Sequence, residues 1–142
     1  MLYNINPILS PRLLYVLRAM GHGDEIAIVD ANFPAHSISK ECIRLDGLSA
    51  TQVASAILSL MPLDNFVENP AHTMQVVNES TSPPIIEEFQ ALINEEADHP
   101  APLNALERFA FYERSHNAFA VVQTGERRLY GNLILKKGVI TP

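Results

Sequence analysis

The chain has 142 residues, with 10 Lys and Arg against 16 Asp and Glu, and 47% of its residues are hydrophobic. This length and apolar fraction fit one folded globular domain, expected to span residues 1–142. The charges are segregated, because residues 45–107 hold ten acidic residues and no Lys or Arg, whereas residues 108–142 hold six basic and two acidic residues. Binding to nucleic acid needs clustered Lys and Arg, so nucleic acid is excluded as a partner.

The sequence also argues against a membrane protein and a secreted protein. Residues 47–63 form the longest stretch without a formal charge, and they contain too many Ser, Thr and Gln for a membrane span. The first residues lack the basic and apolar regions of a signal peptide. Cys42 is the single cysteine, which excludes an internal disulfide and a zinc-finger type of site. A cytoplasmic location is therefore expected.

The first predicted element is a helix over residues 10–20. Ser10 is a good N-cap, and Gly21 is a good terminator because it adopts a left-handed conformation without a Cβ clash. A short apolar strand follows over residues 25–30, and its unbroken apolar run is typical of a strand buried on both faces. Residues 31–39 are predicted to form a loop.

The rest of the chain alternates between predicted strands and helices. Strands are predicted over residues 43–45, 72–77, 119–123 and 133–135, and helices over residues 49–61, 83–96 and 106–117. The spacing turns Ile86, Phe89 and Ile93 inward. The aromatic residues near the last helix are assigned to the core: Phe109, Phe111, Tyr112 and Phe119. This alternation predicts an α/β fold, a layered α/β/α sandwich with a central, mostly parallel or mixed sheet.

Polar residues stand beside the predicted strands, where open α/β sheets bind ligands. His22 lies in a Gly-flanked turn before the first strand, and Asp30 closes that strand. Arg108 lies near the aromatic helix, and Tyr130-Gly131-Asn132 precedes the last strand. Each also has a structural interpretation: an exposed turn His, a turn-forming Asp, or a surface Arg paired with a neighbouring Glu. His36 joins His22 and Asp30 as a conceivable metal set, but this spacing matches no strong metal motif.

No nucleophile elbow, phosphate loop or dinucleotide fingerprint is present. Several strings of residues, however, resemble one known family. They are residues 21–25 (GHGDE), 30–37 (DANFPAHS), 108–114 (RFAFYER), 124–127 (TGER) and 130–139 (YGNLILKKGV). In this order they resemble the fucose mutarotase and ribose pyranase family. Arg108 indicates the fucose branch, because the ribose branch typically has His there. Asn32 departs from the family, where His is expected.

The resemblance implies an isomerase that interconverts the α and β anomers of a reducing sugar, L-fucose in this branch. His22 would be the proton donor and acceptor at the sugar ring. The residues implied to bind the substrate are Asp30, Arg108, Tyr130, Gly131 and Asn132. Asp30 would either bond to sugar hydroxyls or orient His22. No metal, redox group or nucleotide is needed for this chemistry, so no cofactor is expected.

The family also implies a homo-oligomer, in many members a ring-shaped decamer, with active sites near subunit contacts. Three other functions stay open: a ribose pyranase, a sugar-binding module without turnover, and a metal-dependent hydrolase using His22, Asp30 and His36. The acidic segment, residues 45–107, contains none of the expected site residues and is interpreted as scaffold. The fold must then bring residues 22–30 against residues 108–132, within one chain or across a subunit contact.

Overall fold

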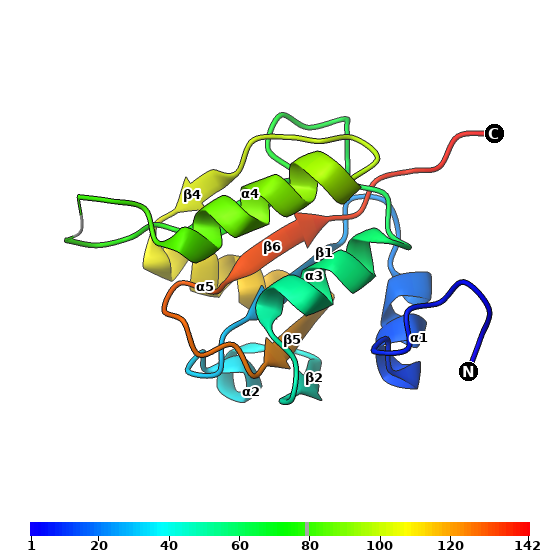
Figure 1. Ribbon diagram of the computed structural model, residues 1–142, viewed down its shortest axis with the longest axis horizontal. Helices are drawn as coiled ribbons and strands as arrows, with labels where there is room; N and C mark the ends of the chain where they lie inside the picture. Colours follow the sequence, from blue (N-terminus) through cyan, green and yellow to red (C-terminus); the bar gives the residue numbers. More distant parts are fainter. Residues whose placement is uncertain (79) are drawn as a thin grey trace.

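A six-stranded mixed sheet forms the centre of the computed structural model, which describes residues 1–78 and 80–142 (Figure 1). The strands are β1 (Glu25–Val29), β2 (Cys42–Leu45), β3 (Ala71–Met74), β4 (Asn104–Leu106), β5 (Ala120–Thr124) and β6 (Leu133–Lys136), in the order β2-β5-β1-β6-β3-β4. β1 pairs in parallel with β5, as do β2 with β5 and β3 with β4. β6 runs antiparallel to both of its neighbours, β1 and β3.

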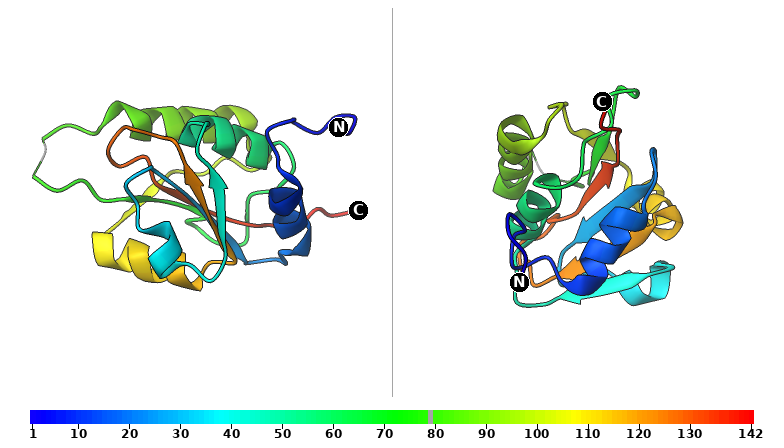
Figure 2. Two further views of the ribbon diagram at one scale, coloured as in Figure 1. Left: turned by 90° about the horizontal axis from the view of Figure 1, so that it is seen from below. Right: turned by 90° about the vertical axis from the view of Figure 1, so that its right-hand side faces the viewer.

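Helices cover both faces of the sheet (Figure 2). They are α1 (Pro11–Ala19), α2 (Ala35–Ile38), α3 (Ala50–Leu58), α4 (Pro84–Glu96) and α5 (Arg108–Asn117). Helices α1, α3 and α4 share one apolar core with Ile26 and Ile28, whereas α2 and α5 share a second core with Ala27 and Val29. The predicted α/β/α layering is therefore confirmed. In the described part of the chain, no helix is long and apolar enough to cross a membrane.

Side-chain caps determine where three of the helices begin. The Ser10 hydroxyl accepts the N–H of Leu13 at the start of α1, as the sequence predicts. Ser49 and Gln52 form a reciprocal capping box before α3. The Glu107 carboxylate accepts two backbone N–H groups at the start of α5, which places Arg108 at the first position of that helix.

The structure contains two short elements that the sequence does not predict. Residues 35–38, expected in a loop, form the single turn of α2, closed by the Ser39 N–H bonded to the Ala35 carbonyl. Residues 104–106, partly assigned to a helix, form β4 at the sheet edge. Both elements are too short to carry a periodic hydrophobic pattern. β4 forms because it pairs with β3.

The predicted inward faces need two corrections. In α4 the buried isoleucine of the first turn is Ile85, whereas Ile86 is only half-buried. Of the four aromatic residues near α5 that were expected in the core, Phe111 is the one that is fully buried, and Phe109 is 64% exposed. Helix α5 buries only one narrow stripe, Phe111 and Ser115, against the sheet. Phe109 and Phe119 consequently point outward, which leaves aromatic surface at both ends of the helix.

The reversed direction of β6 brings distant parts of the chain together at one end of the sheet. Its first residue, Leu133, pairs with Ile28 near the end of β1 and with Thr73 near the end of β3. The segment before β6 therefore meets the segments that leave β1 and β3, and a pocket lies at this meeting point.

Candidate functional site

A pocket of about 210 Å³ opens where β1 and β3 end and β6 begins. It is lined by Asp30, Asn32, Phe33, Met74, Arg108, Tyr112, Leu129, Tyr130 and Asn132. Four of the six residues singled out in the sequence, Asp30, Arg108, Tyr130 and Asn132, thus meet around one cavity. The volume lies below the roughly 300–1,000 Å³ of drug-sized ligand sites, which fits a ligand as small as a single sugar ring.

The floor of the pocket is a reciprocal pair between Asp30 and Asn132. The Asn132 side chain accepts the backbone N–H of Asp30 through Oδ1 at 2.9 Å and donates from Nδ2 to Asp30 Oδ2 at 2.9 Å. The other carboxylate oxygen, Oδ1, accepts the N–H of Asn32 at 2.9 Å. Asp30 is only 6% exposed, and this burial raises the pKa of its carboxyl, although the hydrogen bonds oppose the shift.

Tyr130 projects into the pocket from a backbone conformation that is unusual for its side chain. Its φ is +62°, in the left-handed region that bulky residues rarely adopt. Its phenolic oxygen accepts the N–H of Val77 at 3.3 Å, which leaves the hydroxyl proton free to be donated to a ligand. A strained backbone conformation persists only where the surrounding structure holds it, and such conformations are concentrated at functional sites.

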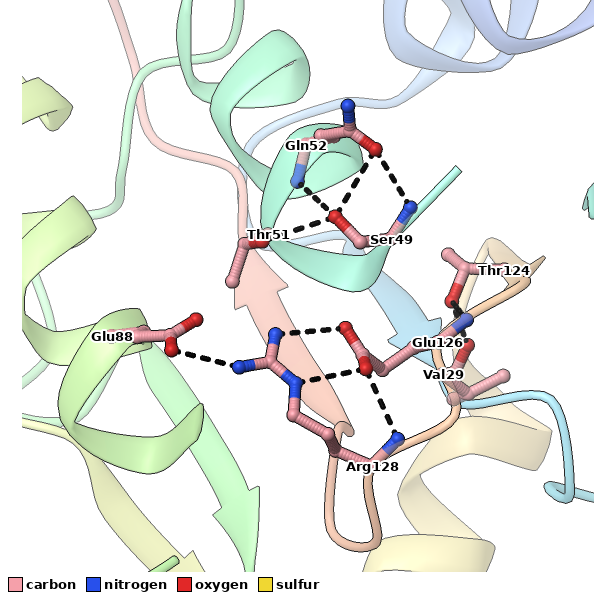
Figure 3. A network of polar contacts seen from close by, with 8 residues as sticks. All are labelled: Val29, Ser49, Thr51, Gln52, Glu88, Thr124, Glu126 and Arg128. Carbon is pink, nitrogen blue, oxygen red and sulfur yellow. Dashed lines mark hydrogen bonds and ion pairs between the residues drawn. The ribbon is translucent and has the colours of Figure 1, made fainter. Parts of the chain in front are cut away.

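A polar network holds the loop that carries Tyr130 (Figure 3). The Thr124 hydroxyl donates to the Val29 carbonyl at 2.8 Å, tying the start of the loop to the end of β1. Farther along, Arg128 donates to both carboxylate oxygens of the buried Glu126 and also to Glu88 of α4. The Arg128 guanidinium lowers the pKa of Glu126, mainly through this hydrogen bonding.

Gly131 follows Tyr130 in the loop and is packed against Glu126 and Arg128 of the same network. A Cβ added there would come within 2.6 Å of the Glu126 Cγ and 3.1 Å of the Ile85 Cδ1. Gly131 therefore shapes the loop by its lack of a side chain, between Tyr130 and Asn132, which both line the cavity.

One wall of the pocket combines a cation with aromatic rings. The Arg108 guanidinium stacks over the Phe109 ring at 5.0 Å. Tyr112, one turn along α5, packs edge-on against Phe33 at 5.3 Å. Fixed donors beside an apolar surface are suited to a ligand with both hydroxyl groups and an apolar edge. Tyr112 lines the cavity, whereas Phe111 belongs to the core beneath it.

His22 lies at the opposite end of the sheet from this pocket. The turn that carries His22 precedes β1, and Asp30 follows β1. The five residues of β1 alone span about 16 Å. His22 Nε2 lies 3.1 Å from Asp64 Oδ1, and its ring packs against Phe66 at 5.2 Å. The His22 side chain is 44% exposed while that of Asp64 is 2% exposed. Within one chain, the partner that orients His22 is therefore Asp64 rather than Asp30.

The acidic segment contributes more than scaffold. Two residues of this segment take part: Asp64 contacts His22, and Met74 lines the pocket. The expectation that residues 45–107 add nothing to the site is therefore wrong. Sequence reasoning missed Asp64 because 42 positions separate it from His22 and its own segment carries no motif.

The metal set considered from the sequence does not form within one chain. His22 and Asp30 lie at opposite ends of β1, and His36 is exposed on α2. Across residues 1–78 and 80–142, no cluster of three or more His, Cys, Asp or Glu side chains is arranged to hold a metal ion.

The fold and the pocket together define an α/β/α protein with a small polar site at the reversed strand of a mixed sheet. The sequence profile of the RbsD / FucU transport protein family matches residues 3–140, and the chain belongs to this family. It is 50% identical to the fucose mutarotase of Mus musculus over 147 residues, which cover 98% of this chain and 95% of that protein.

Solved structures share the fold along nearly the whole chain. The fucose mutarotase of Streptococcus pneumoniae, solved in complex with L-fucose, is 42% identical, with a TM-score of 0.93 and coverage of 99% of this chain and 100% of that one. The RbsD protein of Bacillus subtilis, solved with D-ribose, is 24% identical with a TM-score of 0.73 and covers 96% of this chain and 98% of that one. This second likeness shows a shared fold.

Proposed function

We propose that this protein is an L-fucose mutarotase, an isomerase that interconverts the α and β anomers of the free sugar. The observation that carries the proposal is the pocket in which Asp30, Arg108, Tyr130 and Asn132 converge, in a chain 50% identical to a fucose mutarotase. Hydrogen-bonding groups that converge on one cavity fix the orientation of a polyhydroxylated ring. The apolar faces of Phe33 and Tyr112 suit the methyl group of fucose.

The reaction requires two proton movements and no net change in composition. The C1–O5 bond breaks as an acid gives a proton to O5 and a base takes the proton from the C1 hydroxyl. The aldehyde then rotates about C1–C2, and ring closure on its other face reverses both transfers. Positioned acid and base groups each accelerate such steps by roughly 10²–10⁴-fold.

We assign one proton transfer to His22 and the other to Tyr130. Imidazole is the side chain whose unperturbed pKa lies nearest neutrality, and Asp64 at 3.1 Å orients it. The Tyr130 hydroxyl has its oxygen bonded to the Val77 N–H, so it presents a proton toward the ligand. Asp30, Arg108 and Asn132 then bind the sugar hydroxyls.

Since His22 is far from the pocket in its own chain, we propose that a second copy supplies it. The His22 end of the molecule exposes apolar side chains at Phe66 and Val67, and the pocket end exposes Val77, Phe109 and Leu129. Exposed apolar surface of this kind marks contact sites. We propose that these two ends meet in a head-to-tail contact, which closes into a ring where the rotation between copies allows it. The proposed assembly is a homo-oligomeric ring, of which a decamer is one form, and the exposed apolar side chains at both ends support it.

The test of the activity is NMR saturation transfer between the anomeric protons of L-fucose with catalytic amounts of the protein. We expect faster exchange than in buffer, and we expect the His22→Ala variant to lose it while keeping its circular dichroism spectrum. Faster pyranose–furanose exchange of ribose would select a ribose pyranase. Sugar binding by calorimetry without any exchange would select a binding module. Absence of both binding and exchange would refute the proposal.

The shared site has a separate test by complementation. His22→Ala keeps an intact pocket and Asp30→Ala keeps an intact His22, so each variant alone should be inactive. Refolded together in equal amounts, a head-to-tail assembly regains about a quarter of the wild-type sites, because each site draws on two copies. No recovery from mixed assemblies of normal size would place both halves of the site in one chain.

We further propose a cytoplasmic location, on the ground of the single Cys42.

A further inference from the structure

The turn that carries His22 is held by a strand from the other end of the chain. The Gly23 N–H donates to the Lys137 carbonyl at 2.9 Å, and the Lys137 N–H donates to the Asp24 carbonyl at 2.8 Å. These two bonds attach the residues after His22 to the end of β6. Gly23 has a φ of +85°, so the turn depends on a glycine and has little stiffness of its own.

The Lys137 side chain donates hydrogen bonds to the backbone of residues before His22. Its ammonium donates to the Leu17 carbonyl at 2.7 Å and to the Met20 carbonyl at 2.6 Å, at the C-terminal end of α1. A cation is favourable at this end of a helix dipole. Burial lowers the pKa of Lys137, and Arg18 nearby adds to that effect. One residue thus contacts the chain on both sides of His22.

The same strand also positions Asp64. Leu63 forms a bridge with Lys137, and the Asp64 N–H donates to the Lys136 carbonyl at 3.0 Å. A Cβ at Gly138 would lie 2.7 Å from the Leu63 carbonyl oxygen and 2.9 Å from the Asp64 Cα, so the two segments touch backbone to backbone. His22 and Asp64 therefore approach each other from the two sides of residues 136–138.

We propose that Lys137 is a positioning residue for His22, fixing the turn so that the imidazole stays on Asp64 and points outward toward the sugar of a neighbouring copy. This inference rests on the proposed function. It predicts a particular kinetic effect, because Lys137 lies at the opposite end of the sheet from the pocket: proton transfer slows while sugar affinity is retained.

The experiment compares Lys137→Met with Arg18→Met, a matched control that removes one positive charge from the same helix end. Methionine keeps an unbranched side chain of similar length but cannot donate a hydrogen bond. For Lys137→Met, well below its melting temperature, we expect kcat for fucose exchange to fall about tenfold or more with little change in KM, since small misplacements of a reacting group are costly. Arg18→Met should retain wild-type kcat. Equal kcat values for Lys137→Met and wild type would overturn the inference. A fall in kcat accompanied by a clear rise in KM would also overturn it.

A second measurement does not depend on activity. The His22 imidazole signals in a ¹H–¹⁵N correlation spectrum report its tautomer and its bond to Asp64. We expect Lys137→Met to shift them in the direction produced by Asp64→Asn, whereas Arg18→Met leaves them in place. Unchanged His22 signals in Lys137→Met would overturn the positioning role even if the wild-type protein turned over no fucose. Wild-type inactivity with shifted signals would count against the proposed function alone.

Discussion

Asp30 and Asn132 are 102 positions apart in the sequence and exchange two hydrogen bonds of 2.9 Å. One bond runs from the Asp30 backbone to the Asn132 side chain, and the other joins the two side chains. The pair therefore fixes the end of β1 to the start of β6 and also sets the polar floor of the pocket. Because the carboxylate is buried, its hydrogen bonds must be complete for the folded state to tolerate it.

Exchanging the two side chains tests this arrangement. Asn132→Asp brings two carboxylates together in a buried site and should cost about 3 kcal/mol or more of unfolding free energy. Asp30→Asn sets two amide nitrogens against each other and should cost about 1–3 kcal/mol. In the double variant Asp30→Asn with Asn132→Asp every donor again faces an acceptor, so most of that stability should return. Urea unfolding measures the coupling, and additive losses would contradict the reciprocal pair.

Asp64 should matter for rate and little for sugar affinity. Its carboxylate touches His22 and lies at the opposite end of the sheet from the pocket, so Asp64→Asn removes the carboxylate oxygen that orients the imidazole. We expect kcat for fucose exchange to fall by a factor of roughly 10², with KM nearly unchanged. Glu68→Gln, an exposed acid in the same loop, is the control and should behave as wild type. A full-rate Asp64→Asn variant would rule out this role.

Gly131→Ala should disturb the loop that presents Tyr130. The new Cβ would lie 2.6 Å from the Glu126 Cγ, so either the loop or the Arg128–Glu126 pair must move. We expect KM for fucose to rise severalfold and the melting temperature to fall. Gly47→Ala adds the same methyl group where nothing lies within 4 Å, and it should change neither quantity. Normal KM and stability in Gly131→Ala would show that the loop absorbs the clash.

His72 should make the stability of the protein depend on pH. It is 3% exposed on β3, and its Nδ1 lies 3.1 Å from the Asn104 side-chain nitrogen. Burial lowers the pKa of His72, with a smaller contribution from Arg114. A lowered folded-state pKa means that the stabilisation is present above the unfolded pKa of about 6.5 and is lost as pH falls from there toward the folded pKa.

The measurement is the urea-unfolding free energy of wild type and His72→Val from about pH 7.5 to 5.5, the range in which histidine titrates. The wild type should lose stability more steeply on acidification, with an added slope of at most about 1.4 kcal/mol per pH unit from this one group. Parallel curves for the two proteins would mean that His72 binds its proton equally well in both states.

The order and type of the longer elements follow from local signals, whereas the site depends on contacts that only the fold creates. Ser10 and Ser49 mark helix starts, and the apolar run of β1 identifies a buried central strand. In contrast, β4 is a strand only because β3 lies beside it. The antiparallel direction of β6, which builds the pocket, has no signature in the four residues Leu133–Lys136.

Among the site residues, the strings that resemble the family identified Asp30, Arg108, Tyr130 and Asn132. The fold brings these four residues together around one pocket. The partner of His22 could not be found in that way. Asp64 is an isolated acid that also accepts the N–H of Phe66 in its own turn, so locally it is indistinguishable from a turn former. The strained φ of Tyr130 was equally hidden, since the Tyr-Gly-Asn string suggests an ordinary turn with glycine as its flexible residue.

The separation of His22 and the pocket by the length of β1 has a consequence for how activity depends on assembly. In the proposed head-to-tail arrangement, a pair of copies completes one site and leaves one histidine and one pocket idle at its outer ends. Closure of the ring pairs the remaining histidine with the remaining pocket, so that there is then one complete site per copy. Specific activity should accordingly rise with protein concentration and level off when the rings are closed.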